Sequence, residues 1–189
     1  MRILLLILAL IFTNKPALSN LSLPKDLYFN VYRNNSLIGY HKIDFSINEN
    51  KIIANIEIKF EVTFLGFVVY DYYHQNEETW INGNLKKLIS KTDKNGEVMS
   101  CKLEKIENVY NINGTSRKTK TNLFMMPTSY WKKELVESSL SNTLNTQDCS
   151  IINFKINFLG EEKIYNNNLK TKHYKMEGKE QSGEDVIID

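Results

Sequence analysis

The side chains best suited to acid–base chemistry lie in one short stretch of the sequence, between Asp71 and Glu78. His74 and Glu78 fall on one phase of an alternating pattern, whereas Asp71 and Glu77 fall on the other. A partly buried carboxylate that faces an imidazole could exchange protons with a substrate. Solvent-facing charges on a strand are the simpler interpretation, and Ser129, a candidate nucleophile, lacks a surrounding Gly-x-Ser-x-Gly segment. The sequence therefore predicts a protein that is not an enzyme.

The histidines are the other residues that could bind a metal ion. Three His side chains make a zinc site when the fold brings all of them within about 2 Å of one ion. His41, His74 and His173 are the only histidines, and none of them stands at a close His-x-His or His-x-x-x-His spacing. Each stands next to a tyrosine in a strand-like segment, so we predict separate imidazoles, no metal site and no cofactor.

Aromatic residues gather around the same stretch and offer a binding chemistry instead. Tyrosine and tryptophan combine an apolar ring with a polar group, so a cluster of them can line a pocket for an amphipathic ligand. The alternative is that they fill the interior and cover its rim. The sequence places six such residues near Asp71 or near Pro127: Tyr70, Tyr72, Tyr73, Trp80, Tyr130 and Trp131.

The strand that must position these side chains runs from Ile52 to Phe64. Every even position is apolar, and most odd positions are polar. This period of two requires a β-strand with one buried face and one solvated face. The segment is much longer than the usual strand of about five or six residues. It indicates a large antiparallel sheet that curves over apolar contents.

Further alternating segments are separated by short polar turns. Asn82-Gly83 and Asn113-Gly114 are expected to form hairpin turns, because Asn-Gly readily adopts positive φ values. A short helix over residues 132–139, capped by Thr128 or Ser129, interrupts the strands. The expected fold is mainly β: an antiparallel meander that forms a curved half-barrel or barrel with one short helix. We expect further strands at residues 27–33, 37–48, 67–80, 85–93, 98–106, 109–112, 115–121, 152–158 and 169–176.

The N-terminus has the pattern of a signal peptide. Arg2 precedes an unbroken apolar run over residues 3–12, and Ala17-Leu18-Ser19 provides the small residues that a signal peptidase reads. The apolar run is about half the length that a membrane-spanning helix needs. We therefore predict cleavage after Ser19, export to the periplasm, no transmembrane anchor, and a single β-barrel-like domain over residues 20–189.

The charge of the mature chain argues against nucleic-acid binding. Cleavage would remove Arg2 and Lys15 but no acid, which leaves equal numbers of basic and acidic residues. A neutral chain offers no basic face to displace the counterions of nucleic acid. The two cysteines, Cys101 and Cys149, could pair in an oxidising compartment or remain as two small buried residues. A last strand begins at Asp185 and ends at once, so it is either a short edge strand or the chain lacks its natural C-terminus, and we favour the second.

Several short segments, taken in order, resemble a family of exported bacterial proteins known only as a domain of unknown function. These segments cover most of the mature chain: 28–34 with Ile38-Gly39, 70–74 with 78–80, 127–131, 145–147, and His173-Tyr174 with Gly178. The resemblance implies a curved antiparallel β-fold similar in outline to periplasmic lipoprotein carriers and lipocalins. It also implies a further strand with a Trp-Tyr-Asp-like segment beyond Asp189. Asp148-Cys149 departs from the family pattern, in which a glycine-containing turn follows Gln147.

We predict a non-enzymatic envelope protein that binds an apolar or amphipathic molecule, such as a lipid or an acyl chain, on the concave face of the sheet. The even residues of the long strand would face Phe154 and Ile156, and Trp131 would close the mouth. The alternative is a structural or interaction protein with a filled core that pairs with an envelope partner through a sheet edge. The expected ligand-binding residues are Ile56, Ile58, Phe60, Val62, Tyr70, Tyr72, Tyr130, Trp131, Phe154 and Ile156.

Overall fold

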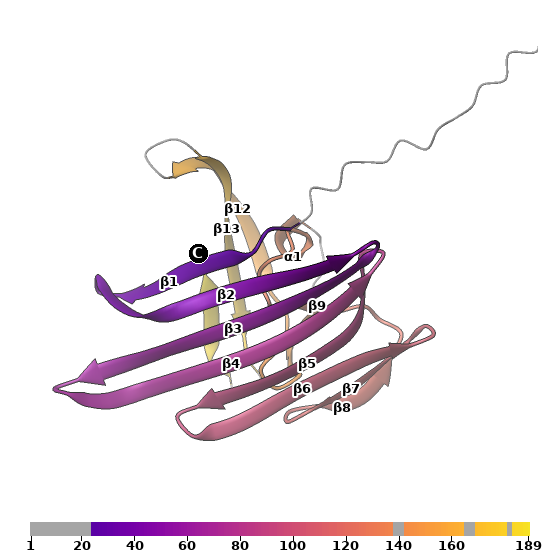
Figure 1. The fold of residues 1–189 in the computed structure, drawn as a ribbon, viewed down its shortest axis with the longest axis horizontal. Coiled ribbons are helices and arrows are strands. Elements are labelled where there is room, and N and C mark those ends of the chain that lie inside the picture. The colour runs from indigo at the N-terminus through magenta and orange to yellow at the C-terminus, as the bar shows by residue number, and fades with distance from the viewer. Residues whose placement is uncertain (1–23, 138–141, 165–168, 181–182) are drawn as a thin grey trace, which may run out of the picture.

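The computed structural model describes residues 24–137, 142–164, 169–180 and 183–189. Its largest element is an eight-stranded antiparallel sheet, the main sheet, whose strands follow one another in chain order (Figure 1). This confirms the predicted mainly β meander. The edge strands β1 and β8 each pair with one neighbour, so the main sheet is open and is not a closed barrel. Its strands are β1 (Leu27–Arg33), β2 (Ser36–Asn48), β3 (Lys51–Phe64), β4 (Phe67–Ile81), β5 (Asn84–Lys94), β6 (Glu97–Ile106), β7 (Val109–Gly114) and β8 (Lys118–Thr121).

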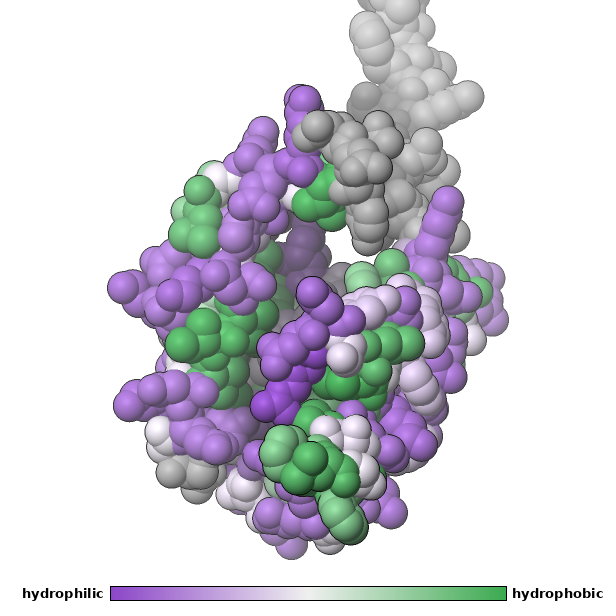
Figure 2. Space-filling view, turned by 90° about the vertical axis from the view of Figure 1, so that its left-hand side faces the viewer, coloured by the Kyte–Doolittle hydropathy of each residue, from purple (hydrophilic) through white to green (hydrophobic). Residues whose placement is uncertain are grey.

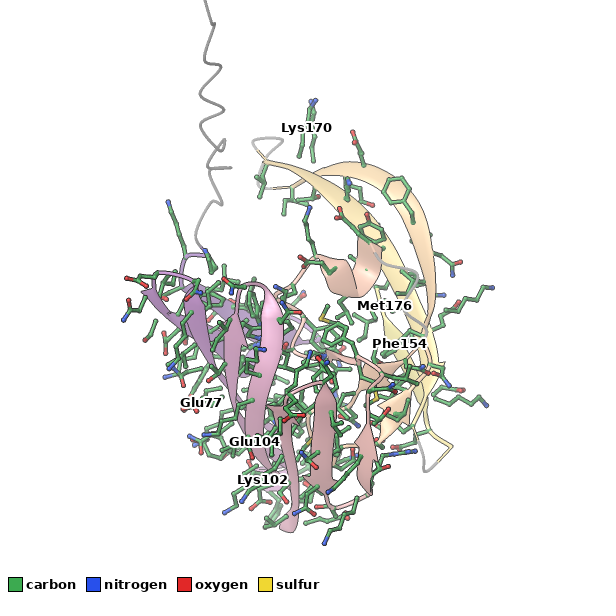
Figure 3. All side chains as sticks on the ribbon, turned by 90° about the vertical axis from the view of Figure 1, so that its right-hand side faces the viewer. Glu77, Lys102, Glu104, Phe154, Lys170 and Met176 are labelled. Atoms are coloured by element: carbon green, nitrogen blue, oxygen red, sulfur yellow. A yellow bond between two sulfur atoms is a disulfide. The ribbon has the colours of Figure 1, made fainter. Side chains whose placement is uncertain are left out.

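A second, C-terminal sheet of three strands stands across from the main sheet, with a short helix and loops between them (Figure 3). A small three-stranded sheet lies within this intervening region, which we call the covering segment (residues 122–137 and 142–152). The covering segment contains β9 (Met126–Pro127), α1 (Glu134–Glu137), β10 (Thr143–Leu144) and β11 (Ile151–Ile152). The C-terminal sheet contains β12 (Lys155–Ile164), β13 (Leu169–Lys179) and β14 (Asp185–Ile188).

The alternation predicted for the long strand is present in β3. Ala54 and Ile56 are buried on the inner face, whereas Asn55 and Lys59 between and beyond them are exposed. The inner face is the one that the covering segment and the C-terminal sheet face. The outer face carries charged side chains such as Glu77, Lys102 and Glu104, which Figure 3 shows on the far side of the main sheet from the C-terminal sheet.

The core lies between the inner face of the main sheet and the covering segment. Trp80, Leu85 and Leu88 of the main sheet form one buried cluster with Phe154 and Met176 from the opposite side. Each fully buried side chain of this kind stabilises the fold by about 1.5–3 kcal/mol. The core therefore fixes the covering segment against β4 and β5.

A disulfide bond joins Cys101 of β6 to Cys149 of the covering segment, and both cysteines are buried. This bond fits an extracytoplasmic protein. The predicted turn at Asn113-Gly114 is wrong, because Gly114 ends β7 and the chain turns over residues 115–117. A Cβ atom on Gly114 would lie 2.4 Å from the Cβ of Cys149, so the glycine permits close packing beside the disulfide.

Several boundaries differ from the sequence-based expectations. The helix is described over Glu134–Glu137 only, and residues 138 and 139 of the predicted helix lie outside the described residues. The strand expected over 152–158 is divided into β11 and β12, and Gly160 lies at an irregularity within β12. The predicted signal peptide also lies outside the described residues. No helix in the described part of the chain is long and apolar enough to span a membrane.

Candidate binding site

A band of polar side chains crosses the middle of the inner face. His74, Asn76 and Glu78 occupy successive inward positions of β4, and all three are buried. Ser90 and Thr92 continue the band on β5. Buried polar groups are costly unless they form hydrogen bonds, so this band requires polar partners from the covering segment.

The carboxylate of Glu78 collects most of these partners. The indole N–H groups of Trp80 and Trp131 donate to Glu78 Oε2 over 2.9 and 3.0 Å, and Asn76 Nδ2 donates to Oε1 over 2.9 Å. The hydroxyl of Ser129 adds a further hydrogen bond. We call these five residues the Glu78 cluster. Because Trp131 and Ser129 belong to the covering segment, the cluster ties that segment to β4.

Burial determines the protonation behaviour of the Glu78 cluster. Glu78 has no solvent exposure, and this burial raises the pKa of its carboxyl, although the four hydrogen bonds oppose the shift. The ammonium of Lys132 lies 4.3 Å from the ring centre of Trp80 and 5.0 Å from that of Trp131, on which it forms cation–π contacts. The carboxyl of Glu78 is thus fully buried within a packed cluster that holds the covering segment to β4.

His74 is bonded to threonines rather than to a carboxylate. Its Nδ1 lies 2.8 Å from Thr92 Oγ1, and its Nε2 lies 3.4 Å from Thr146 Oγ1. Burial lowers the pKa of His74 to about 4, so the imidazole is neutral at pH 7. Although His74 and Glu78 share the inner face, the described hydrogen bonds hold them in separate groups.

A small cavity of about 80 Å³ lies beside His74. A water molecule in the liquid takes up about 30 Å³, so this cavity is large enough for a few waters or for a small polar group. It is far smaller than the roughly 300–1,000 Å³ of a pocket that encloses a drug-sized ligand. Its lining includes Ile58, Tyr72, Ser129, Tyr130, Glu180 and Val186.

Tyr130 reaches this cavity from an uncommon backbone conformation. Its φ of 61° lies in the left-handed region, which bulky residues rarely adopt. Burial of the hydroxyl end raises the pKa of Tyr130 to about 12, and the hydroxyl is hydrogen-bonded to Thr128. The residue as a whole stays half-exposed, so its ring connects the cavity with the surface.

Stacked rings extend from the cavity toward the β3–β4 hairpin. The ring centres of Tyr72 and Phe60 are 5.0 Å apart, those of Phe60 and Tyr70 are 5.8 Å apart, and each pair is nearly parallel. We call Tyr70, Phe60 and Tyr72 the aromatic ladder. Phe60 and Tyr70 are only partly buried, whereas Tyr72 is buried and lines the cavity. The ladder is therefore an accessible aromatic surface with a polar cavity at its inner end.

His41 adds an unpartnered polar atom next to this surface. It pairs with Ile58 across β2 and β3 on the inner face, and its Nε2 is buried without a hydrogen-bond partner among the described residues. Burial lowers the pKa of His41. Buried polar atoms normally have a partner, so His41 Nε2 is an unsatisfied polar atom beside the ladder.

The structure brings together some of the predicted site residues and separates others. The ladder and the cavity unite Ile56, Ile58, Phe60, Tyr70, Tyr72 and Tyr130, and Val62 lies opposite Tyr70. Trp131 lies in the Glu78 cluster, edge-on to Phe45, instead of at the mouth. Phe154 is buried against Gly178, and Ile156 packs beside the main core. Glu180 and Val186, rather than Phe154 and Ile156, line the cavity beside Tyr72.

Sequence reasoning missed the residues that the covering segment and the β13–β14 region contribute to the cavity. These are Thr128, Asn145, Thr146, Gln147, Glu180 and Val186. The segments 127–131 and 145–147 stand out in the sequence, but nothing in them shows which strand they cover. The sequence places His74 and Glu78 on one phase, but the expectation that this charge faces solvent is wrong for them, because both residues are buried.

No group of three or more His, Cys, Asp or Glu side chains within the described ranges is arranged to hold a metal ion. His173, on the C-terminal sheet, lies between Glu162 and Asp189, at 2.5 and 2.6 Å. These two carboxylates raise the pKa of His173. The three histidines therefore occupy two different regions of the molecule.

A family model described as a domain of unknown function, DUF6134, matches residues 29–189. The match includes the whole of the ladder, the Glu78 cluster and the cavity. No curated protein and no solved structure matches the chain. The resemblance drawn from short segments of the sequence is confirmed at the level of a domain of unknown function.

Proposed function

The chain belongs to the DUF6134 family of domains of unknown function. We propose that it has a binding function and holds an amphipathic molecule against the inner face of the main sheet. The apolar part of the ligand packs along the aromatic ladder, and its polar end enters the cavity beside His74. The observation that carries this proposal is the stack of Phe60 and Tyr70, which remains partly exposed on the inner face, beyond the region that the covering segment fills.

The lining of the cavity supports a ligand with an uncharged polar end. Glu180 and the hydroxyl of Tyr130 border the cavity, and no Lys or Arg is among the described residues that line it. A phosphate or carboxylate in the cavity would therefore meet an acidic residue, and the cation nearest to Glu180 in charge interaction, Lys94, does not line the cavity. Burial raises the pKa of Glu180, which favours its neutral form beside a hydroxyl or an amide. A monoacylglycerol has this chemistry.

Fluorescence of N-phenyl-1-naphthylamine, which increases in apolar sites, tests the proposal. Tyr70→Ala removes one ring of the ladder and is expected to weaken probe binding about fivefold, since an aromatic contact contributes about 1 kcal/mol. Tyr73→Ala is the matched control, because Tyr73 is a partly buried tyrosine of the same strand on the outer face, bonded to Glu57. Monoolein should displace the probe, and dodecyl phosphate should not.

Two results would contradict the proposal. Wild-type protein that gives no probe fluorescence has no accessible apolar site on its inner face. An equal loss for Tyr70→Ala and Tyr73→Ala shows that the ladder has no special part in binding. If dodecyl phosphate displaces the probe as well as monoolein does, the assignment of an uncharged polar end is wrong.

A second candidate function is pairing with a protein partner through the edge strand β1. The inner face around Trp80 and Leu88 is filled by the covering segment, and β1 exposes Tyr28, Phe29 and Tyr32 at an unpaired edge. An added strand from a partner would extend the main sheet there. Protection of the β1 amides from hydrogen exchange only when a partner is present would favour this function.

A further inference from the structure

The hairpin between β3 and β4 ends in a run of exposed apolar residues. Phe64, Leu65, Phe67, Val68 and Val69 have exposed fractions of 65, 80, 74, 56 and 54%. We call these five residues the apolar tip. It lies at the left-hand end of the main sheet in Figure 1, and Figure 2, which faces that end, shows an apolar patch low on this face. Such a contiguous patch on a protein surface usually marks an interaction site.

The apex of this hairpin departs from the other turns of the described main sheet. Leu65 and Gly66 have φ values of 50° and 83°, as in a type I′ turn, for which Asn-Gly is the favoured pair. Every other two-residue hairpin of that sheet has polar or glycine residues at its apex: Asn34-Asn35, Glu49-Asn50, Asn82-Gly83, Asn95-Gly96 and Glu107-Asn108. A leucine is disfavoured in the left-handed region, so the turn itself does not explain it.

The tip projects beyond the neighbouring strand. β4 pairs with β5 from Tyr72 onward, and Asp71 is hydrogen-bonded to Asn95 of the β5–β6 turn, so residues 67–70 extend past that hairpin. The hairpin still satisfies its own backbone across the pairs Phe64–Phe67 and Thr63–Val68. A projecting hairpin with paired backbone can enter an apolar phase to a shallow depth without leaving most of its polar groups unbonded.

We propose that the apolar tip inserts shallowly into the surface of a lipid bilayer. The apolar tip comprises five exposed side chains, far fewer than the roughly 20–30 residues that each partner contributes to a standard protein interface. The patch forms the projecting end of a single hairpin, which suits a deformable lipid surface better than a rigid partner. Tyr70 follows the tip directly, at the level where tyrosine rings lie at a membrane interface.

The charges behind the tip favour a neutral lipid surface. Glu61 and Asp71 pair across the hairpin, and Arg33 lies with Glu61 along the same furrow beside the tip. No net positive charge is available there to attract anionic lipids. Insertion therefore depends on apolar contact. It goes beyond ligand binding, because it places the open end of the aromatic ladder at the lipid surface.

Flotation of the full chain with dioleoylphosphatidylcholine vesicles tests this inference. We expect wild-type protein to float with the vesicles in 0.1 M and in 1 M NaCl, because apolar contact is not screened by salt. Leu65→Asn restores the favoured Asn-Gly apex and should reduce binding at least tenfold without loss of folding. Val98→Asn is the matched control: Val98 is 55% exposed beside the β5–β6 hairpin and away from the tip.

The outcomes separate this inference from the proposed ligand site. Leu65→Asn should still bind N-phenyl-1-naphthylamine in vesicle-free buffer, whereas Tyr70→Ala should not bind it with full affinity. The inference is overturned if wild-type protein stays with the unbound fraction, or if Leu65→Asn floats as the wild type does. It is also overturned if binding requires anionic lipid. The same holds if the wild-type protein sediments as a dimer and Leu65→Asn sediments as a monomer.

Discussion

At the scale of single residues, Glu78 connects the two halves of the chain. It is a residue of β4, yet two of its hydrogen-bond donors, Trp131 and Ser129, come from the covering segment more than 50 positions later. A buried carboxylate is costly, so its retention depends on these donors. Removing the carboxylate should therefore loosen the covering segment as well as β4.

We expect Glu78→Ala to reduce the free energy of unfolding by at least about 3 kcal/mol, because it leaves two indole N–H groups and an amide without acceptors. Glu78→Gln keeps an acceptor oxygen, and its new amide can donate to Asn76 Oδ1, which is buried without a partner among the described residues. Urea unfolding measures both variants. Glu77→Ala, on the exposed outer face of the same strand, is the control and should change stability by less than about 0.5 kcal/mol.

The Glu78 variants also carry a pH dependence. A carboxyl whose folded pKa is raised stabilises the fold below its ordinary pKa of 4.5, and this contribution is lost as the pH rises through the folded pKa. The stability of wild-type protein relative to Glu78→Gln should therefore fall as the pH rises above 4.5. A difference that stays constant over this range would contradict the shift.

His74 gives a pH dependence of the opposite sign. Unfolded His74 binds its proton near pH 6.5 and folded His74 only near pH 4, so stability falls as the pH drops from 6.5 to 4. Wild-type protein should lose about 3 kcal/mol more unfolding free energy between pH 7 and pH 4 than His74→Gln does. This figure follows from the lowered pKa of His74, because each pKa unit corresponds to 1.36 kcal/mol. His173→Gln is the control on the exposed C-terminal sheet and should not reduce the loss. An acid loss as large in His74→Gln as in the wild type would argue against a neutral, buried imidazole.

The sequence shows which face of a strand a residue occupies but not what covers it. The alternation around Asp71–Glu78 places His74 and Glu78 on one face, and both are buried. The simpler interpretation, that Glu78 faces solvent, is wrong. Its hydrogen-bond donors Trp131 and Ser129 come from a loop without alternating residues, so the sequence does not show that this loop covers Glu78. Trp131 is separated from the predicted mouth for the same reason.

At the scale of elements, the strands of the main sheet follow from their period and their turns, and the covering segment depends on contacts between distant residues. The disulfide illustrates this, since it joins β6 to the covering segment across 48 positions of sequence. Cys101 lies on the buried phase of its strand, which the sequence shows, but Cys149 lies in a loop with a positive φ of 67°. Its neighbour in space, Gly114, resembles a turn residue in the sequence and is a packing residue in the structure.

We expect the double variant Cys101→Ser, Cys149→Ser to lose about 4 kcal/mol of unfolding free energy, from the entropy of a loop of this length. Urea unfolding of the wild type with and without a reductant gives an independent measure of the same change. A loss below about 1 kcal/mol by either route would show that the bond does little to hold the covering segment to the main sheet.

The β3–β4 hairpin gives a prediction about stability as well as binding. Because Leu65 has a φ of 50°, Leu65→Asn should raise the free energy of unfolding by about 0.5–1 kcal/mol, as asparagine tolerates this conformation better. Thermal unfolding measures the change. Asn95→Leu, at the apex of the β5–β6 hairpin with a φ of 55°, should lower stability by more than this amount, because it also removes the acceptor of the Asp71 N–H. A destabilised Leu65→Asn would mean that the leucine supports the fold.

At the scale of the whole molecule, the open main sheet leaves one end of its inner face accessible. The covering segment fills the region of Trp80 and Leu88, whereas the aromatic ladder and the apolar tip extend beyond it toward the β3–β4 hairpin. The sequence predicts the curved antiparallel meander, because its period and its turns are local features. It does not show where the inner face stays open, because that depends on how far the covering segment and the C-terminal sheet reach.

The central claim is that this accessible end holds an amphipathic molecule. Native mass spectrometry of full-length protein, purified from its source without detergent, tests it most directly, with the adduct identified after denaturing extraction. We expect an adduct with the mass of a neutral lipid on the wild type and on Tyr73→Ala, and a reduced adduct on Tyr70→Ala. Bare protein mass for the wild type under these conditions, or an equal adduct on Tyr70→Ala, would contradict the account.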